Sequence, residues 1–254
     1  MPLDIVTIPC LSDNYAYLLH DTGTGATALI DAPEVAPINR CLAERGWSLD
    51  QVLITHHHPD HIDALAGLRN GDPAVIGAAA DQHRLPDLTH AVAAGDVLHI
   101  GSQTVQVFEA WGHTKGHVAY YLADADALFS GDSLMVMGCG RLFEGNAEMM
   151  WATLGQFMAL PPQTRVYSGH EYTAGNAKFA LSVEPENPAL IERVRRISEL
   201  RARGEDTMGP NMALEMATNP FLRADLPEVK AAVGMPGAPD AEVFGEIRRR
   251  KDNF

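Results

Sequence analysis

The sequence predicts an α/β domain followed by a small helical domain, and two observations support this organisation. Up to about residue 170, short β-rich runs alternate with stretches of helical periodicity. Beyond that point, helical segments are separated by Pro and Gly, and no convincing strand is predicted. A chain of 254 residues suits one large domain with a smaller appendage. We therefore expect one domain at 1–170 and a second at 171–254.

Strands are expected where short apolar and β-branched runs lie between turn residues. Ser-Asp-Asn at 12–14 and Thr-Gly-Thr-Gly at 22–25 separate the first three runs, as hairpin turns do. The predicted strands are Ile5–Pro9, Tyr15–Leu19, Thr27–Asp31, Gln51–Thr55, Ala74–Ile76, Thr104–Glu109, Val118–Leu122, Ala127–Ser130 and Arg165–Ser168.

Helices are expected where apolar residues recur with helical spacing and a stop signal follows. Gly46 ends the first helical stretch, and the Pro pair at 161–162 ends the second. The predicted helices are Pro37–Arg45, Glu148–Leu160, Ala177–Val183, Pro188–Arg203, Glu228–Val233 and Ala241–Arg250.

Composition and charge exclude several classes of protein. The formal net charge of −14 disfavours non-specific nucleic-acid binding, and it requires a local basic patch for any anionic substrate. No stretch approaches the roughly 20 apolar residues of a membrane-spanning helix, and the N-terminus does not resemble a signal peptide. Cys10, Cys41 and Cys139 are scattered without a CxxC motif. We therefore expect a cytoplasmic protein without disulfides.

Potential metal ligands gather in the segment Thr-His-His-His-Pro-Asp-His at 55–61, directly after a predicted strand. In an extended chain alternate side chains share a direction, so His56 and His58 should point together and His57 away. A turn at Pro59 would direct Asp60 and His61 to a second position. An HxH pair alone is most often surface or core histidine, whereas four such groups in six residues favour a metal. Neutral imidazole and carboxylate suit zinc, iron or manganese.

Three further candidates follow strands, and each is preceded by Gly: His113, Asp132 and His170. Gly allows the backbone to approach a crowded site closely. Four ligands in one loop cannot all bind a single catalytic ion and still leave room for substrate, so two ions are expected. Asp132 could bridge both. One ion would then take His56, His58 and His113, and the other Asp60, His61 and His170.

The remaining histidines and one acid receive other roles. For His57 and His117 we favour a supporting or core position over direct ligation. Asp31, at the end of a strand, is expected to support the ligand loops by hydrogen bonding. Four histidines have no partner by spacing and are expected at the surface: His20, His83, His90 and His99.

The HxHxDH motif with the later Gly-His, Gly-Asp and Gly-His pairs resembles the metallo-β-lactamase superfamily, whose fold is an αββα sandwich with metals at one edge. Further segments resemble the glyoxalase II (hydroxyacylglutathione hydrolase) family and extend to the last residue of the chain. They are 129–134 (FSGDSL), 138–145 (GCGRLFEG), 168–173 (SGHEYT), 176–180 (NAKFA), 219–223 (NPFLR) and 248–254 (RRRKDNF).

This resemblance implies a catalytic domain at 1–170 that binds two divalent metal ions, zinc before iron or manganese, and a helical glutathione-recognition domain at 171–254. Metal-bound hydroxide would hydrolyse S-D-lactoylglutathione to glutathione and D-lactate, the second step of methylglyoxal detoxification. The catalytic residues would be Asp60 and Asp132. The substrate contacts would be Arg141, Phe143, Tyr172, Arg248 and Lys251. Arg141 and Phe143 depart from the Lys and Tyr that are familiar in the family.

Two alternatives differ in chemistry. A persulfide dioxygenase of the same fold would use a single iron, and it would not need Asp60, His61 and His170 together. A purely structural metal domain would have closed, usually cysteine-rich sites, whereas seven ligands without cysteine favour open positions. No nucleic-acid or membrane partner is expected. Nothing in the sequence requires more than a monomer.

Overall fold

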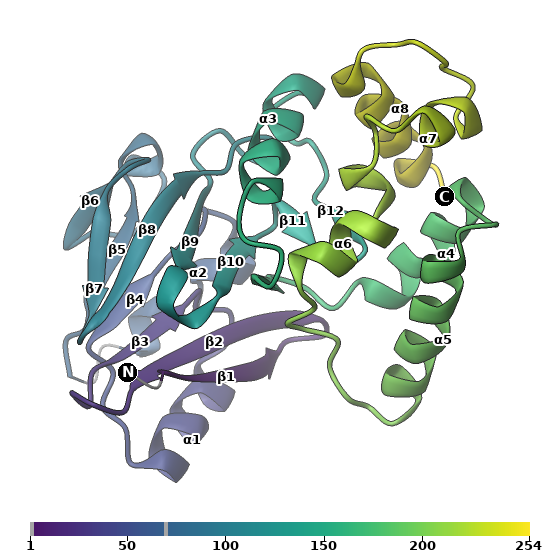
Figure 1. The fold of residues 1–254 in the computed structure, drawn as a ribbon. Coiled ribbons are helices and arrows are strands. Elements are labelled where there is room, and N and C mark those ends of the chain that lie inside the picture. The colour runs from purple at the N-terminus through teal and green to yellow at the C-terminus, as the bar shows by residue number, and fades with distance from the viewer. Residues whose placement is uncertain (1–2, 69–70) are drawn as a thin grey trace. The chain divides into compact units, whose positions relative to one another are not determined.

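The computed structural model describes residues 3–68 and 71–254. The chain divides into two compact units, shown in Figure 1. Unit 1 comprises residues 1–110 and 115–131, and unit 2 comprises residues 111–114 and 132–254. Each is described by itself.

Unit 1 contains a six-stranded sheet with the order β1-β2-β3-β4-β5-β6. The pairs β1–β2 and β2–β3 are antiparallel hairpins, and β3 to β6 pair in parallel. A parallel pair needs a crossover, and α1 (Val35–Arg45) provides it between β3 and β4 before ending at Gly46, whose φ is 67°. The strands are β1 (Leu3–Cys10), β2 (Asn14–Asp21), β3 (Thr27–Ile30), β4 (Gln51–Leu53), β5 (Ala74–Ala78) and β6 (His90–Val92).

A second, antiparallel set of strands in unit 1 has the order β10-β9-β8-β7. Every residue of β9 and β10 is buried, so both faces of these strands are covered. In β8, buried and exposed side chains alternate over most of the strand, as expected for one solvent-facing side. The strands are β7 (Val97–Ile100), β8 (Gln103–Glu109), β9 (Val118–Leu122) and β10 (Ala127–Gly131).

Unit 2 is mostly helical, and Asn side chains cap three of its helices. Asn146, Asn187 and Asn211 each accept a hydrogen bond from a backbone N–H in the first turn. The elements are β11 (Leu134–Met135), β12 (Gly138–Cys139), α3 (Ala147–Met158), β13 (Arg165–Ser168), α4 (Thr173–Val183), α5 (Pro188–Ala202), α6 (Met212–Thr218), α7 (Pro227–Ala232) and α8 (Asp240–Asp252). The short elements of unit 1 are α2 (Pro59–Ile62) and the 3-10 turns η1 (Leu65–Gly67), η2 (Ala79–Asp81) and η3 (Ala123–Ala125). Unit 2 contains one further 3-10 turn, η4 (Pro220–Leu222).

A buried polar cluster joins the helices of unit 2 to the β11–β12 hairpin. Glu215 of α6 is fully buried and forms an ion pair with Arg193 of α5. The same carboxylate accepts hydrogen bonds from the backbone N–H of Met137 and from Asn219. Asn219 also donates to the carbonyl of Gly138 at 3.0 Å. Because a buried charge needs partners, this cluster fixes the hairpin against the helices.

The predicted elements agree with the structure except at a few places. Each predicted strand and helix is present, and among the described residues only helices follow β13. The elements β6, β7, β11, β12 and α6 were not predicted, and Pro59 begins α2 where a turn was expected. The expectation that His20 lacks a partner is wrong, because its ring stacks on Trp47 at 4.1 Å and its Nδ1 lies 2.8 Å from Thr27 Oγ1. Within residues 3–68 and 71–254, no helix is long and apolar enough to span a membrane.

Candidate metal centre

The histidine loop of unit 1 begins where β4 ends. His56 Nε2 and His58 Nδ1 lie 3.1 Å apart, which confirms that these two side chains point together. His58 is the extended residue before α2, and Pro59 occupies the first helical position. Pro pre-sets the helical backbone there, so Asp60 and His61 follow within one turn. The sequence thus places four donors on a sharp strand-to-helix junction.

Asp31 bonds to residues at both ends of this junction. Its carboxylate accepts hydrogen bonds from the backbone N–H and the hydroxyl of Thr55, both at 2.8 Å, and lies 2.8 Å from Nδ1 of His61. Asp31 adopts a φ of 55°, a left-handed conformation that Asp tolerates better than most residues. The expected supporting role of Asp31 is confirmed. Because Nδ1 of His61 is held, a metal would bind this ring through Nε2.

Asn14 is a supporting residue that the sequence did not reveal. It lies at the start of β2, and its Nδ2 donates to the Oδ2 of Asp60 at 3.0 Å and to the Asp60 carbonyl at 3.1 Å. These bonds fix the orientation of a half-exposed carboxylate. The pattern Ser-Asp-Asn predicts only a turn, and no signal in its spacing distinguishes Asn14 from the other turn residues.

His57 and His117 have the supporting positions that were expected. His57 Nδ1 lies 2.9 Å from a carboxylate oxygen of Asp81. The buried ring of His117 stacks on His56, with centroids 4.7 Å apart. A Cβ on Gly131 would lie 2.7 Å from Nε2 of His117, so only glycine fits there. The three other histidines expected at the surface are exposed: His83, His90 and His99.

In unit 2, two imidazoles face one carboxylate oxygen. The Oδ2 of Asp132 lies 3.5 Å from Nε2 of His113 and 3.3 Å from Nε2 of His170, and all three side chains are buried. His113 Nδ1 lies 2.8 Å from the carbonyl of Arg141, which orients its Nε2 toward Asp132. Buried nitrogen and carboxylate donors of this kind fit a divalent ion. Asp132 therefore lies against both histidines of unit 2, and its role as a bridge between two ions stays a prediction.

Glycines make room for these three residues. A Cβ on Gly112 would lie 2.6 Å from Met150, and a Cβ on Gly140 would lie 2.0 Å from the Asp132 carbonyl. The φ of Gly112 is 140°. The close approach predicted for the Gly before His113 is therefore confirmed.

Two exposed aromatic rings lie against these ligand candidates. Phe143 is 61% exposed, and its ring meets His113 edge to face with centroids 5.2 Å apart. Tyr172 stacks on His170 at 4.8 Å with only 6° between the planes. The family resemblance predicts both residues as substrate contacts. Within unit 2, they provide apolar surface directly beside the histidines.

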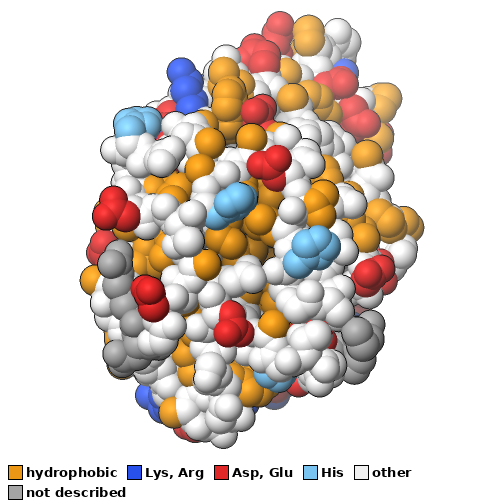
Figure 2. Space-filling model, turned by 90° about the vertical axis from the view of Figure 1, so that its left-hand side faces the viewer, with side chains coloured by type: hydrophobic (Ala, Val, Ile, Leu, Met, Phe, Trp, Pro, Cys, Tyr) orange, Lys and Arg blue, Asp and Glu red, His pale blue; other side chains and the backbone are white. Residues whose placement is uncertain are grey.

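The predicted basic residues lie around the end of α8. Arg248 is buried, donates to the carbonyl of Cys139 at 2.8 Å and lies over the ring of Phe221. Lys251 lies over the ring of Phe179, and burial lowers its pKa below the usual value, with Arg248 and Arg141 lowering it further. On the face drawn in Figure 2, acidic side chains are scattered widely and Lys and Arg lie near the edges. Arg248 and Lys251 thus lie together in the last turns of α8, and their role as the basic patch for an anionic substrate stays a prediction.

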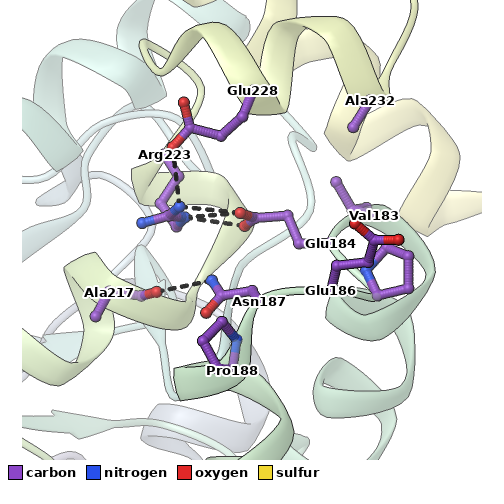
Figure 3. Close-up of a pocket in the computed structure, with 10 residues that line it drawn as sticks. Val183, Glu184, Glu186, Asn187, Pro188, Ala217, Arg223, Glu228 and Ala232 are labelled. Atoms are coloured by element: carbon purple, nitrogen blue, oxygen red, sulfur yellow. Dashed lines mark hydrogen bonds and ion pairs between the residues drawn. The ribbon is translucent and has the colours of Figure 1, made fainter.

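A separate cavity of about 500 Å³ lies among the helices of unit 2 (Figure 3). Arg223 binds Glu184 from Nε and Nη2 at 2.9 Å and approaches Glu228 at 3.5 Å, so its charge is compensated. Asn187 donates to the Ala217 carbonyl at its edge. Among the described residues that line this cavity, none belongs to the predicted site.

Comparisons with known protein families identify the family of this chain. Residues 12–170 match the family model of the metallo-beta-lactamase superfamily, and residues 171–254 match that of the hydroxyacylglutathione hydrolase C-terminus. The chain is 57% identical, over 100% of both sequences, to hydroxyacylglutathione hydrolases from Cereibacter sphaeroides and Ruegeria pomeroyi. The chain belongs to the hydroxyacylglutathione hydrolase family.

Solved structures agree on the fold of this family member. ETHE1 from Myxococcus xanthus is 27% identical with a TM-score of 0.67, covering 98% of this chain and 90% of its own. TTHA1623 in a di-iron-bound form is 25% identical with a TM-score of 0.63, covering 86% of this chain and 100% of its own. The predicted fold class, a metallo-β-lactamase αββα sandwich followed by a helical region, is confirmed.

Proposed function

We propose that this chain hydrolyses the thioester of S-D-lactoylglutathione, and of related 2-hydroxyacylglutathiones, to glutathione and D-lactate. The observation that carries the proposal is the match of residues 171–254 to the C-terminus of hydroxyacylglutathione hydrolases, because that segment distinguishes this family within a superfamily of many chemistries. Full-length relatives at 57% identity carry the same name. The reaction is the second step of methylglyoxal detoxification.

The proposed cofactor is a pair of divalent metal ions, with zinc preferred and iron or manganese compatible with the same donors. Asp132 would serve both ions, since its carboxylate faces His113 and His170 alike. Bound metal lowers the pKa of water toward neutrality and so supplies a nucleophile at physiological pH. TTHA1623, a structural relative, has been solved in a di-iron-bound form. The proposed ligands are His56, His58, Asp60, His61, His113, Asp132 and His170.

The side chains of the protein would act by fixing the tautomers of the histidine rings and the orientation of Asp60. Asp31 and the Arg141 carbonyl each engage the Nδ1 of one histidine, which fixes that ring for ligation through Nε2. Asp60, oriented by Asn14, would accept a hydrogen bond from the attacking water. The leaving group is a thiolate whose parent thiol has a pKa of about 8.5, so no strong general acid is needed.

Substrate recognition is proposed for the residues around α8 and beside the histidines of unit 2. Lactoylglutathione carries two carboxylates and one ammonium, and the basic patch offers cations in a chain with a net charge of −14. Arg141 and Lys251 would bind carboxylate, and the rings of Phe143 and Tyr172 would line the thioester region. Arg248 is the remaining proposed contact. Phe143 has no hydroxyl, so it would contribute by packing alone.

The alternative of a mononuclear-iron persulfide dioxygenase is less supported, because the full-length relatives at 57% identity are named as hydrolases. The proposed setting is the cytoplasm, in keeping with cysteines that are all free, and the proposed state is a monomer. Gel filtration of the purified protein tests the oligomeric state.

Two measurements on purified protein test the function. Lactoylglutathione should be consumed with stoichiometric release of free thiol, and elemental analysis should give two metal ions per chain. Full activity with one ion would contradict the metal pair. Oxygen consumption with glutathione persulfide, without lactoylglutathione hydrolysis, would support the dioxygenase instead.

A further inference from the structure

Asp252, near the end of α8, joins two arginines that are far apart in the sequence. Its Oδ1 accepts a hydrogen bond from Nε of Arg248 at 3.1 Å and forms an ion pair with Nη2 of the same arginine at 2.9 Å. The Nε of Arg141 approaches the same oxygen at 3.7 Å. Arg248 lies one turn before Asp252 on the same helix, whereas Arg141 follows β12. A single carboxylate oxygen therefore connects the helix to the 140s loop.

The two arginines differ in freedom. Arg248 is only 5% exposed, its Nη1 donates to the Cys139 carbonyl, and its guanidinium lies 5.1 Å from the centroid of the Phe221 ring. These contacts fix it, and it in turn fixes Asp252. The Arg141 side chain is 65% exposed and meets Asp252 through its Nε edge. A guanidinium held by one edge can still bind a second carboxylate through its terminal nitrogens.

The charges around Asp252 favour an anionic ligand. Arg141, Arg248 and Lys251 supply three cations against the one carboxylate, and the pKa of Lys251 responds to all three of the other groups. In a chain with a net charge of −14, this patch is locally positive even with Asp252 ionised. Asp252 thus lowers the positive charge of a patch proposed to bind an anion. By its charge alone, Asp252 would weaken anion binding, so a role that favours binding has to come from its contacts.

We propose that Asp252 is a positioning residue for substrate binding: anchored by the buried Arg248, it orients Arg141 to receive a carboxylate of the glutathione thioester. This inference rests on the proposed function. It also predicts the direction in which the affinity for the anion changes when Asp252 is removed. If Asp252 acted only through its charge, removing it would tighten binding of an anion. If it positions Arg141, removing it weakens binding.

The test compares Asp252→Asn with Glu246→Gln. Glu246 lies on the same helix and loses the same charge, but it pairs with Arg249 and Arg250 instead. For Asp252→Asn, KM for lactoylglutathione should rise about three- to fivefold, the scale of one or two partly exposed ion pairs, with kcat unchanged. Glu246→Gln should leave both parameters unchanged. A neutral thioester without glutathione should be hydrolysed equally by all three proteins.

A double-mutant cycle isolates the pair. In an Arg141→Ala background, Asp252→Asn should add little, because the group that it positions is gone. Fully additive effects, or a KM that falls in the single variant, would overturn the inference. A loss of kcat on the neutral thioester together with a lower Tm would do the same, since that result indicates a merely structural role.

Binding of S-methylglutathione, measured by calorimetry, separates this inference from the proposed reaction. The Kd should weaken about three- to fivefold in Asp252→Asn, on the same ion-pair scale. If the wild type binds S-methylglutathione with this dependence on Asp252 but does not hydrolyse lactoylglutathione, the proposed reaction is wrong and the positioning role stands. If the wild type does not bind S-methylglutathione, the positioning role is wrong.

Discussion

The Nδ1 atom of His61 lies 2.8 Å from the Oδ2 atom of Asp31 in the interior of unit 1. Both side chains are buried, and Asp31 also accepts two hydrogen bonds from Thr55, the residue before the histidine loop. One carboxylate therefore fixes both the entry of the loop and the ring at its far end. Its contribution to metal binding can be tested without changing any proposed ligand.

Asp31→Asn should weaken metal binding about 10- to 100-fold, as loss of a supporting hydrogen-bond partner commonly does. An amide nitrogen facing His61 would donate to Nδ1 and place the ring proton on Nε2, the atom that must bind the metal. Competition with a chromophoric chelator measures the affinity. Asp124→Asn, an exposed residue of η3, is the control. Unchanged affinity in Asp31→Asn would show that its hydrogen bond does not select the tautomer.

Asp132→Ala should remove most bound metal and reduce activity by orders of magnitude, because the proposal assigns one residue to both ions. His57→Ala should retain metal, since His57 is held by Asp81. Elemental analysis of the two purified variants checks this difference. Equal metal loss in both would mean that the inward-facing histidines have been wrongly assigned.

Glu215→Gln should destabilise the protein by about 3–5 kcal/mol, because it leaves the buried Arg193 charge without its counter-ion. Glu192→Gln breaks an exposed, solvent-screened pair with Arg195 and should change the free energy of unfolding far less. Urea unfolding monitored by circular dichroism gives both values. Similar losses in the two variants would refute the idea that the buried cluster holds unit 2 together.

Thiol reactivity should follow burial. Burial raises the pKa of Cys10 to about 12 and of Cys139 to about 11, so both should resist a disulfide reagent at pH 8 while the half-buried Cys41 reacts. The unfolded thiol has a pKa of 9.0, which is lower than in the fold. Because the fold favours the protonated thiol, the contribution of Cys139 to the free energy of unfolding is fully present below about pH 9. It is lost as the pH rises toward 11. Urea midpoints at pH 8 and pH 10.5 test the sign, with Cys139→Ala as the comparison.

Local signals in the sequence account for much of the fold and for the inner part of the site. The hairpin turns, Gly46 and the Pro pair at 161–162 are short-range features, and they located the elements well. The role of Asp31 followed from its place at a strand end. In contrast, β11 and β12 have two residues each, and β6 has three, too few for any periodicity to appear.

Long-range partners could not be predicted. Nothing near Asn14 indicates that it bonds Asp60, 46 residues away, and nothing near Arg248 indicates the carbonyl of Cys139, 109 residues earlier. The stacking of His20 on Trp47 joins β2 to the residue after α1's cap in the same way. Such pairs depend on how the elements pack, and spacing along one chain does not encode that packing.

The division of the chain at 131/132 has a consequence for evolution. The two family models meet at 170/171, yet the helices beyond that point pack on residues from 132 onward, as Arg248 does on Cys139 and Trp151 on Phe244. The segment matched by the C-terminal family model and the compact unit therefore have different borders. If a gene fusion transferred only residues 171–254 to another hydrolase, the apolar side chains of these helices that pack on residues 132–170 would be left exposed. A successful transplant of the helical region would have to bring the hairpin and α3 with it.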